Sequence, residues 1–276
     1  MPELPEVETV ARDLRPLLIG QTLMRVRCGA SRLRRPWQEP WSDVVRGSSI
    51  LAVERRGKWL MLPLGAAQPS ALLVHLGMTG QFTVAAADEA VPDHLHLTFD
   101  LDDGRELRFR DVRRFGSIEW FADADSLRSE LNRKLGPGPG DLTREGFAAA
   151  VCSSQRTLKA ILLDQSVVAG VGNIYADEAL FRAKLHPEVR GSALSPQRCE
   201  VLRLAAMHVI AIAVEHRGST IRDYVGGSGL RGEYQHELAA YGRTGEPCLR
   251  CGTAIEAIRV AGRSSHYCPK CQRKPG

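Results

Sequence analysis

Residues 1–9 read MPELPEVET, a chain start in which a proline and a carboxylate stand directly before the opening of an amphipathic helix. Pro5 suits the first turn of that helix, where its missing N–H removes no hydrogen bond. Apolar residues then recur at helical spacing: Val7, Val10, Leu14, Leu17 and Leu18. Gly20 is the expected stop. Because a helix that buries one face is fixed in space, we expect Pro2 and Glu3 to be held rather than frayed.

Removal of Met1 would turn Pro2 into a free secondary α-amine, and the small side chain of Pro2 favours that removal. An α-amine titrates near pH 8, so a sizeable fraction is neutral and nucleophilic. Such an amine can attack the C1′ carbon of a deoxynucleoside and form an iminium of the Schiff-base type, with Glu3 moving the protons. On these two residues alone, a protective Pro2 and a Glu3 that favours the helix N-terminus remain the preferred alternative.

The composition is that of an ordinary soluble globular protein, with 276 residues, 43% hydrophobic and 25% charged. This length allows two domains with cores of their own. No apolar run approaches the ~20 residues needed to cross a bilayer. The acidic start is unlike a positively charged signal segment. We therefore expect a cytoplasmic protein without membrane contact.

Positive charge is concentrated in two stretches of a chain whose net charge is +5. Residues 241–276 hold seven Lys or Arg against two Glu, and five arginines fall within 105–114. Two separated basic stretches fit a polyanion that lies across two domains, and solvated charged faces are the alternative.

Alternating apolar residues predict short strands between residues 23 and 121. The expected strands are 23–28, 50–62, 72–76, 94–101, 106–109 and 117–121, with turns at 56–57 and 102–104. One helix and six or more short strands imply a β-sandwich or barrel with the helix at its edge. Residues 136–140 read GPGPG, which neither helix nor strand tolerates, so they are expected to form a linker.

Helical spacing replaces alternation beyond the linker. Helices are expected at 143–152, 157–165, 173–183 and 196–216. The turn GVGN at 170–173 precedes the third, where Asn173 and the helix N-terminus can face an anion; a plain capped turn is the alternative. The glycine-rich loop 217–233 is long enough to act as a lid over a ligand.

The cysteines give the strongest purely chemical signal. Cys248 and Cys251 form one CxxC pair, Cys268 and Cys271 form another, and sixteen residues separate the pairs. This spacing predicts one structural Zn²⁺ that holds a β-hairpin with Arg263 near its tip. A closed Cys₄ shell leaves no open position for a substrate, and a disulfide is the alternative. Core packing suffices for the isolated Cys28, Cys152 and Cys199.

With these motifs in order, the sequence resembles the formamidopyrimidine-DNA glycosylase and endonuclease VIII family, in its 8-oxoguanine branch. The resemblance covers nearly the whole chain. It rests on PELPEVET at 2–9, RRGKWL at 55–60, HLGMTG at 75–80, RRFG at 113–116, GVGNIYADE at 170–178 and the terminal cysteine pairs. One departure is His266, two residues before Cys268, where the family pattern leads us to expect an aromatic side chain.

The resemblance implies roles for single residues. It makes Pro2 the nucleophile, Glu3 the acid and base, and Lys58 a phosphate contact that also transfers a proton in β-elimination. Arg263 matches the arginine of the δ-elimination step, although a guanidinium with a pKa above ~12 is a better phosphate clamp than an acid.

Further matches concern DNA. Met78, Arg113 and Phe115 match the residues that fill the space left by an extruded base. Residues resembling phosphate contacts or their supports are His75, His94, Arg156, Lys159 and Asn173, for several of which a structural role is the alternative. Thr220 and Tyr224 are candidates for the lid that closes over the lesion.

We therefore predict an α+β protein of two domains. The expected parts are an N-terminal catalytic β-sandwich domain flanked by helices (1–135), a linker (136–140), a helix-two-turns-helix domain with the lid (141–240), and a Cys₄ zinc-finger β-hairpin (241–276). The expected function is a bifunctional DNA glycosylase and abasic-site lyase of base excision repair that excises oxidised purines such as 8-oxoguanine and formamidopyrimidines, followed by β,δ-elimination.

The expected partner is double-stranded DNA with oxidised bases or abasic sites, bound by a monomer that joins the nucleoid when on DNA. Two alternatives remain open. One is a glycosylase of the endonuclease VIII type for oxidised pyrimidines, and the other is a non-catalytic zinc-finger protein that binds damaged DNA.

Overall fold

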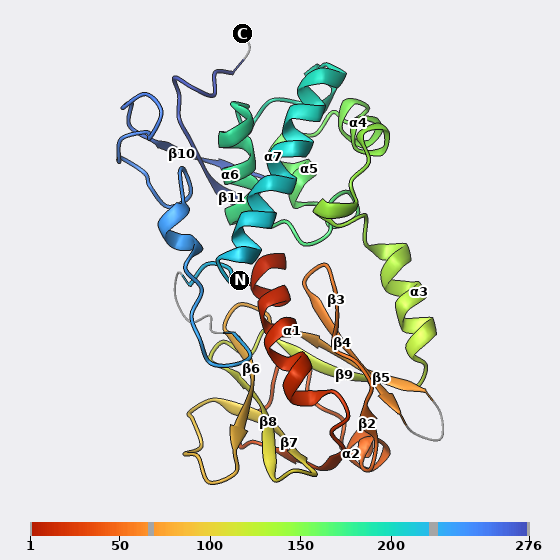
Figure 1. The fold of residues 1–276 in the computed structure, drawn as a ribbon. Coiled ribbons are helices and arrows are strands. Elements are labelled where there is room, and N and C mark those ends of the chain that lie inside the picture. The colour runs from red at the N-terminus through yellow and green to blue at the C-terminus, as the bar shows by residue number, and fades with distance from the viewer. Residues whose placement is uncertain (1, 66–68, 221–225, 275–276) are drawn as a thin grey trace. The chain divides into compact units, whose positions relative to one another are not determined.

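The computed structural model describes residues 2–65, 69–220 and 226–274, which form two compact units (Figure 1). The first unit comprises Met1–Asn132 with His216–Glu233, and the second comprises Arg133–Glu215 with Tyr234–Gly276. No helix of the described residues is long and apolar enough to span a membrane.

The first unit is the expected β-sandwich with α1 packed against it. One sheet has the antiparallel order β1-β7-β8-β6, and the other has the order β2-β4-β5-β9 with β3 paired to β4. Their bounds are β1 Leu23–Cys28, β2 Ser49–Ile50, β3 Glu54–Arg56, β4 Trp59–Gly65, β5 Ser70–His75, β6 Gly80–Ala86, β7 Leu95–Leu101, β8 Arg105–Asp111 and β9 Ser117–Phe121. The buried face of α1 (Leu4–Leu18) joins the same apolar core as the two sheets.

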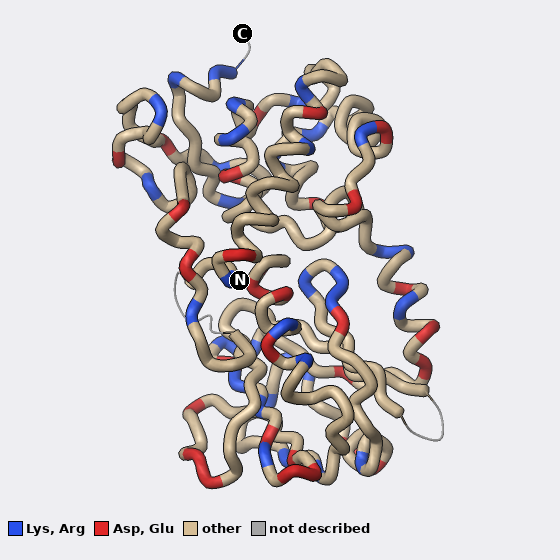
Figure 2. The backbone as a smooth tube through the Cα atoms, in the orientation of Figure 1, with Lys and Arg blue, Asp and Glu red and all other residues tan. Residues whose placement is uncertain are grey.

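Three elements of this part were not predicted: β6, α2 (Glu39–Val45) and α3 (Ala124–Lys134). Few apolar residues mark α3. In α3 only Ala124, Leu127 and Leu131 are buried, and both signs of charge follow one another along its length in Figure 2. The carboxylate of Asp123 accepts hydrogen bonds from two backbone N–H groups of its first turn, which starts the helix.

The second unit contains the four helices expected from the sequence and the zinc-finger hairpin. Their bounds are α4 Arg144–Cys152, α5 Leu158–Leu163, α6 Asn173–Ala183 and α7 Pro196–Glu215, followed by β10 Glu256–Val260 and β11 Arg263–Tyr267. Three short 3₁₀ turns complete it: η1 Pro139–Asp141, η2 Gly191–Ala193 and η3 Tyr234–Glu237. Threonine side chains cap α4 and α5, which places both helix starts within one residue of the predicted ones.

The boundary between the units lies inside α3, between Asn132 and Arg133, whereas the sequence placed a linker at 136–140. That glycine-proline stretch belongs to the second unit, and part of it is held by backbone hydrogen bonds there. Gly136 donates its N–H to the Gln165 carbonyl, and Pro137 accepts from the Ala169 N–H. A Cβ on Gly136 would lie 2.2 Å from the Ser166 oxygen, so glycine is required by close backbone contact.

The loop expected as a lid also belongs to a different unit from the one that the sequence predicted. The sequence placed 217–233 in the helical domain, but the structure groups His216–Glu233 with the first unit. The physical reason is that two carboxylates of α1, one of them buried, accept hydrogen bonds from this loop, as described below.

Candidate active site and zinc centre

The chain start is held in a buried position directly before α1. Pro2 is buried, and the Glu3 side chain is 2% exposed. Glu6, also 2% exposed, accepts a hydrogen bond from the Glu3 N–H at Oε2, 2.7 Å away. This carboxylate satisfies a backbone donor that the helix itself leaves unpaired and so fixes Glu3.

The same Glu6 carboxylate reaches one end of the predicted lid loop. Its Oε1 accepts a hydrogen bond from the Ser219 N–H at 2.7 Å. The preceding Gly218 has a φ of +76°, and a Cβ there would lie 2.8 Å from the same Oε1. Both the backbone conformation and the close approach therefore require glycine. One carboxylate fixes the chain start and the loop stem together.

A second carboxylate of α1 anchors this loop at two points, one at its start and one within it. Asp13 accepts hydrogen bonds from Arg217 at 2.6 Å and from the Ser228 hydroxyl at 2.8 Å. Thr220 lies between these anchors, and its hydroxyl accepts a hydrogen bond from the Gly232 N–H at 2.8 Å. Thr220 thus holds the loop closed on itself. Tyr224 lies outside the described residues.

Lys58 occupies the turn between β3 and β4 and is 8% exposed. The hairpin is tied to α1 because Arg55 on β3 donates to the Glu8 carboxylate at 2.7 Å. Burial by itself raises the pKa of Glu8, but the hydrogen bonds and charges of Arg55 and Arg15 together outweigh it and hold that pKa below its ordinary value. The tip of this hairpin is basic in Figure 2.

His75 ends β5, and its ring packs on Trp59 with ring centroids 4.4 Å apart. Burial, followed by the charges of Lys58 and Arg35, lowers the pKa of His75 to about 4. The neutral ring accepts the Gly77 N–H at Nδ1, 3.1 Å away, which leaves the proton on Nε2 as a donor. His94, by contrast, is exposed, has a φ of 62° and stands directly before β7.

Met78 and Phe115 lie on two neighbouring loops, and both are partly exposed at 36% and 37%. The Arg113 guanidinium lies over the Phe115 ring, 4.8 Å from its centroid. These loops are in backbone contact, since a Cβ on Gly77 would lie 2.4 Å from the Gly116 nitrogen. The structure therefore brings the three predicted space-filling residues to one place.

Asp111, which is 0% exposed, joins these loops. One carboxylate oxygen accepts from the Thr79 hydroxyl at 2.5 Å and from the Arg113 N–H at 3.2 Å. The other accepts from the Gly116 N–H at 2.7 Å. The carboxylate fixes the loop of Met78 relative to the loop of Phe115.

In the second unit Asn173 begins α6, and its amide donates to the Ser264 carbonyl of β11 at 2.9 Å. Lys159 is 0% exposed and donates to the Asn173 carbonyl at 2.9 Å and to the Asp177 carboxylate at 2.5 Å. Its burial excludes a direct phosphate contact in this conformation, so Lys159 acts as a support for Asn173.

His266 fills the position where an aromatic residue was expected. Its ring packs edge-on against Tyr241 with centroids 4.9 Å apart. Its backbone N–H and Nδ1 both lie 2.9 Å from the second oxygen of Asp177. Histidine thus keeps the aromatic packing and adds a polar link from β11 to α6.

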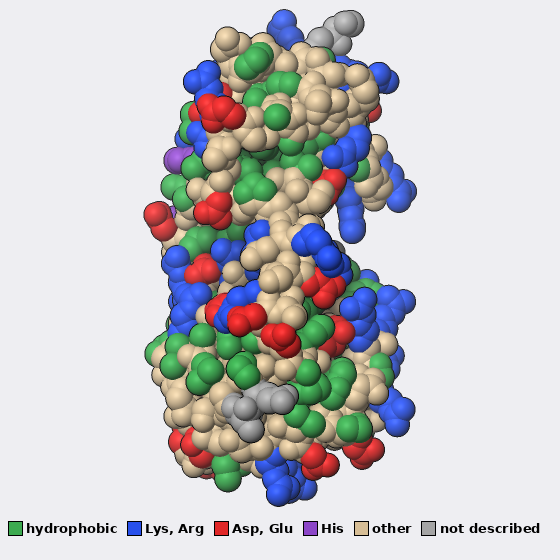
Figure 3. Space-filling model, turned by 90° about the vertical axis from the view of Figure 1, so that its right-hand side faces the viewer, with side chains coloured by type: hydrophobic (Ala, Val, Ile, Leu, Met, Phe, Trp, Pro, Cys, Tyr) green, Lys and Arg blue, Asp and Glu red, His purple; other side chains and the backbone are tan. Residues whose placement is uncertain are grey.

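The arginines expected near phosphates are exposed. Arg263 begins β11, directly before the Ser264 that contacts Asn173, and is paired in register with Val260. Arg156 forms an ion pair with Asp164 at 2.7 Å. On the face shown in Figure 3, Lys and Arg side chains lie along both side edges of the first unit.

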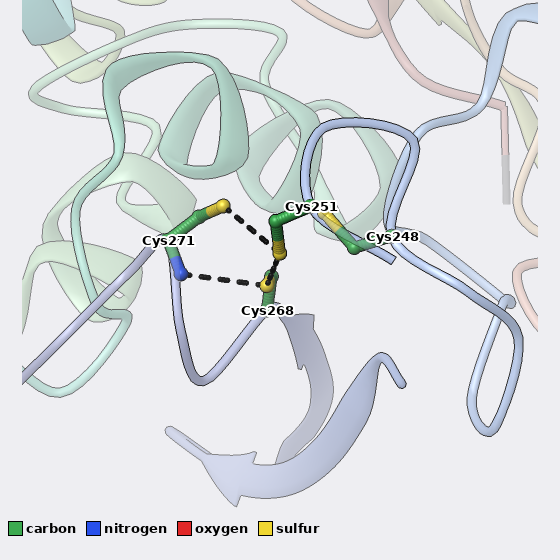
Figure 4. A group of neighbouring side chains, drawn as sticks. All are labelled: Cys248, Cys251, Cys268 and Cys271. Carbon is green, nitrogen blue, oxygen red and sulfur yellow. Dashed lines mark hydrogen bonds between the residues drawn. The ribbon is translucent and has the colours of Figure 1, made fainter. Parts of the chain in front are cut away.

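The four CxxC cysteines form one cluster in which all sulfur atoms lie within 4.8 Å of one another (Figure 4). Tetrahedral Zn²⁺ with Zn–S bonds of about 2.3 Å requires sulfurs about 3.8 Å apart, so the cluster fits the ion. Backbone N–H groups of Arg250 and Cys271 point at sulfurs of Cys248 and Cys268, each at 3.4 Å. This is the expected structural zinc site.

Five carboxylates that hold these segments were not predicted from the sequence: Glu6, Asp13, Asp111, Asp177 and Glu178. Glu178 accepts three backbone N–H bonds from 239–241, although burial raises its pKa. Only Glu6 carried a readable signal, because Glu3 and Glu6 have the spacing of a capping box.

Three family models match in chain order. They are the formamidopyrimidine-DNA glycosylase N-terminal domain (1–118), the formamidopyrimidine-DNA glycosylase H2TH domain (135–225) and the zinc finger found in FPG and IleRS (245–273). The formamidopyrimidine-DNA glycosylase of Geobacillus kaustophilus is 45% identical over 280 residues, which cover 99% of this chain and 100% of that protein.

Solved structures agree with these matches. A Lactococcus lactis FPG mutant G226P in complex with a Fapy-dG containing DNA superposes with a TM-score of 0.91 at 37% identity. The Lactococcus lactis Fpg with an abasic-site DNA gives a TM-score of 0.90 at 36% identity, and each comparison covers 99% of this chain and 100% of the other. The chain belongs to the formamidopyrimidine-DNA glycosylase family.

Proposed function

We propose that Pro2, freed of Met1, is the nucleophile of this chain and that Glu3 is its acid and base. As a member of its family the chain is a DNA glycosylase of base excision repair for oxidised purines, with abasic-site lyase activity. The observation that supports Pro2 and Glu3 is their fixed, buried place before α1, on the helix whose Glu6 also holds the stem of the lid loop.

In this mechanism the Pro2 nitrogen attacks C1′ of the damaged nucleotide, and the bond from C1′ to the base breaks. The departing base takes the proton that the attacking amine loses. The nitrogen lone pair then breaks the bond from C1′ to the ring oxygen, Glu3 protonates that oxygen, and the iminium forms. Removal of a C2′ proton then expels the 3′ phosphate, and a second elimination expels the 5′ phosphate. A buried, prepositioned amine needs little further ordering for this attack.

The remaining residues position the DNA. Lys58 contacts a phosphate and transfers a proton in β-elimination. The exposed Arg263 and Arg156 each bind a phosphate. His75 donates from Nε2 because its lowered pKa keeps the ring neutral. His94 is proposed as a further backbone contact. Asn173 faces a phosphate at the start of α6, supported by Lys159.

Base extrusion leaves a gap in the duplex that Met78, Arg113 and Phe115 fill. Their shared position, with Phe115 and Met78 partly exposed, suits a wedge between bases. Thr220 supports the loop that closes over the extruded base, and Tyr224 is assigned to the same lid. The first unit thus carries the nucleophile, the wedge residues and some of the phosphate contacts, and the second unit carries the remaining phosphate contacts.

The proposed partner is double-stranded DNA that contains an oxidised base or an abasic site. The Lactococcus relatives were crystallised with DNA of these two kinds. A monomer suffices, since the proposed catalytic and DNA-positioning residues all lie on this one chain. We propose a cytoplasmic protein that is associated with the nucleoid while bound to DNA.

Borohydride trapping tests the nucleophile. Borohydride reduces an iminium to a stable amine, so the zinc-loaded protein should become covalently linked to a duplex with one 8-oxoguanine. A variant with one glycine inserted between Met1 and Pro2 converts the Pro2 nitrogen into an amide and should lose trapping. Full trapping by that variant contradicts the proposal, and mass spectrometry of each N-terminus confirms which residue comes first.

Two controls separate binding from chemistry. The extended variant should still bind a duplex with a reduced abasic analogue, because its DNA contacts are unchanged; a loss of this binding would point to misfolding instead. Duplexes with thymine glycol test substrate class. Faster excision of thymine glycol than of 8-oxoguanine would contradict the purine assignment.

A further inference from the structure

Cys152 and Cys199 are far apart in sequence but meet in the second unit. Cys152 is the last residue of α4, and Cys199 lies in the first turn of α7. Their sulfur atoms are 2.7 Å apart. A disulfide bond is about 2.05 Å long, so a shift of less than an ångström would bring them to bonding distance.

The two thiols differ in their access to solvent. Cys152 is partly exposed, whereas Cys199 is 0% exposed. Burial, together with the neighbouring Cys152, raises the pKa of the Cys199 thiol. A dissolved oxidant therefore reaches Cys152 first, and Cys199 remains a protonated thiol directly beside it.

We propose that Cys152 and Cys199 are a redox modification site that forms an intramolecular disulfide in the presence of hydrogen peroxide. The Cys152 sulfur attacks one peroxide oxygen, the O–O bond breaks, and water leaves behind a sulfenic acid. The Cys199 sulfur then attacks the Cys152 sulfur, the S–O bond breaks, and the Cys199 proton leaves in a second water. Two thiols are oxidised and one peroxide is reduced to two waters.

The position of the pair gives this bond a consequence. The 47-residue separation of the two cysteines encloses α5, α6 and the buried Lys159–Asp177 pair that supports Asn173. Closing a loop of this length restricts the unfolded chain and stabilises the folded one. Peroxide also generates oxidised bases, so the second unit would be reinforced under the conditions that supply the substrate.

The test uses the full-length zinc-loaded protein. It is treated with graded hydrogen peroxide, its free thiols are alkylated, and it is digested with trypsin without reduction. Cleavage after Arg144, Arg156, Arg198 and Arg203 should release a cross-linked pair of peptides, 145–156 with 199–203. Dithiothreitol should separate them. Zinc content is measured in parallel, so that only peroxide doses that leave the zinc bound are used.

Three variants complete the test. Cys28→Ser, which alters the exposed cysteine of the first unit, should leave the cross-link unchanged, whereas Cys152→Ser and Cys199→Ser should abolish it. Oxidation should raise the Tm of the second unit by roughly 10 °C in the wild type and not in Cys152→Ser. Recovery of both peptides unlinked, or of Cys152 as sulfinic acid with free Cys199, overturns the proposal. The partly exposed position of Cys152 makes its serine variant informative even if Cys199→Ser fails to fold.

Discussion

The two units hold functional segments with the same device, a buried carboxylate, but they supply it with different donors. In the first unit, Asp111 accepts from the Thr79 hydroxyl and from the backbone of Arg113 and Gly116. In the second, Asp177 accepts from the Lys159 ammonium and from His266. Both carboxylates are 0% exposed.

Because the donors differ, neutralising the carboxylate should destabilise the two units by different amounts. Loss of charge at Asp111 weakens its hydrogen bonds from uncharged donors. The free-energy cost of weakening such bonds is about one to a few kcal/mol. Loss of charge at Asp177 also leaves an ammonium without its counter-ion inside the protein, which is costlier. The same substitution should therefore distinguish a loop anchor from an ion-pair support.

Zinc removal should have the largest effect and should separate the units. Structural zinc in small fingers contributes about 10–16 kcal/mol to folding. Chelation should unfold the β10–β11 hairpin, remove the Ser264 partner of Asn173 and abolish DNA binding. All four tryptophans, Trp37, Trp41, Trp59 and Trp120, belong to the first unit. Their fluorescence should stay unchanged, and a simultaneous loss of this signal would contradict the independence of the first unit.

Asp177→Asn is expected to destabilise the second unit by about 3–5 kcal/mol, because the buried Lys159 charge loses its carboxylate. Chemical denaturation followed by far-ultraviolet circular dichroism measures this. Asp141→Asn, the same change at an exposed carboxylate, is the control. Adding Lys159→Met to Asp177→Asn should recover part of the loss. If Asp177→Asn lowers the free energy of unfolding by less than about 1 kcal/mol, the ion pair does not stabilise the second unit.

Asp111→Asn is expected to cost less, about 2 kcal/mol, because its donors are uncharged. The amide can still accept one or two of the three hydrogen bonds. Tryptophan fluorescence reports the denaturation midpoint of the first unit directly. Excision from duplex DNA should fall as the loops of Met78 and Phe115 lose their fixed relation. Asp88→Asn in an exposed turn is the matched control, and equal midpoints for both variants would contradict the role of Asp111.

Much of the fold followed from the sequence because its signals are local. The helix α1 from Leu4 to Leu18 shows a regular apolar face, the threonine caps mark α4 and α5, and the cysteine spacing marks the zinc site. The predicted helices in the second unit therefore match closely. Elements such as α3, with few apolar residues, carry no such pattern and were missed.

The supports of the site were harder to predict because they depend on contacts between distant residues. Nothing near Asp111 in sequence shows that it meets Thr79, and nothing near Asp177 shows that it meets His266. The same limit explains why Cys152 and Cys199 were taken as isolated and why the 217–233 loop was assigned to the helical domain. Motif position identified the candidate residues, but only the packing shows what holds each one.

A pH-dependent effect, similar in size to that of Asp111→Asn, concerns positive charge, which the two units treat differently. In the second unit, Asp177 neutralises the charge of Lys159. In the first unit, the charge of Lys58 acts on His75 instead. Burial, together with this charge, lowers the pKa of His75 from 6.5 to about 4. The unfolded chain therefore takes up a proton as the pH falls through 6.5, while the folded chain does not until about pH 4. The stability that His75 contributes is complete above pH 6.5 and is lost as the pH falls toward 4.

Between about pH 7.5 and pH 5 the loss should be about 2 kcal/mol. Tryptophan denaturation midpoints at the two pH values measure it, and His75→Gln should remove this part of the pH dependence. An unchanged pH dependence in His75→Gln would mean that the ring takes up its proton equally in the folded and unfolded chain, and that it cannot be the neutral phosphate donor assigned to it.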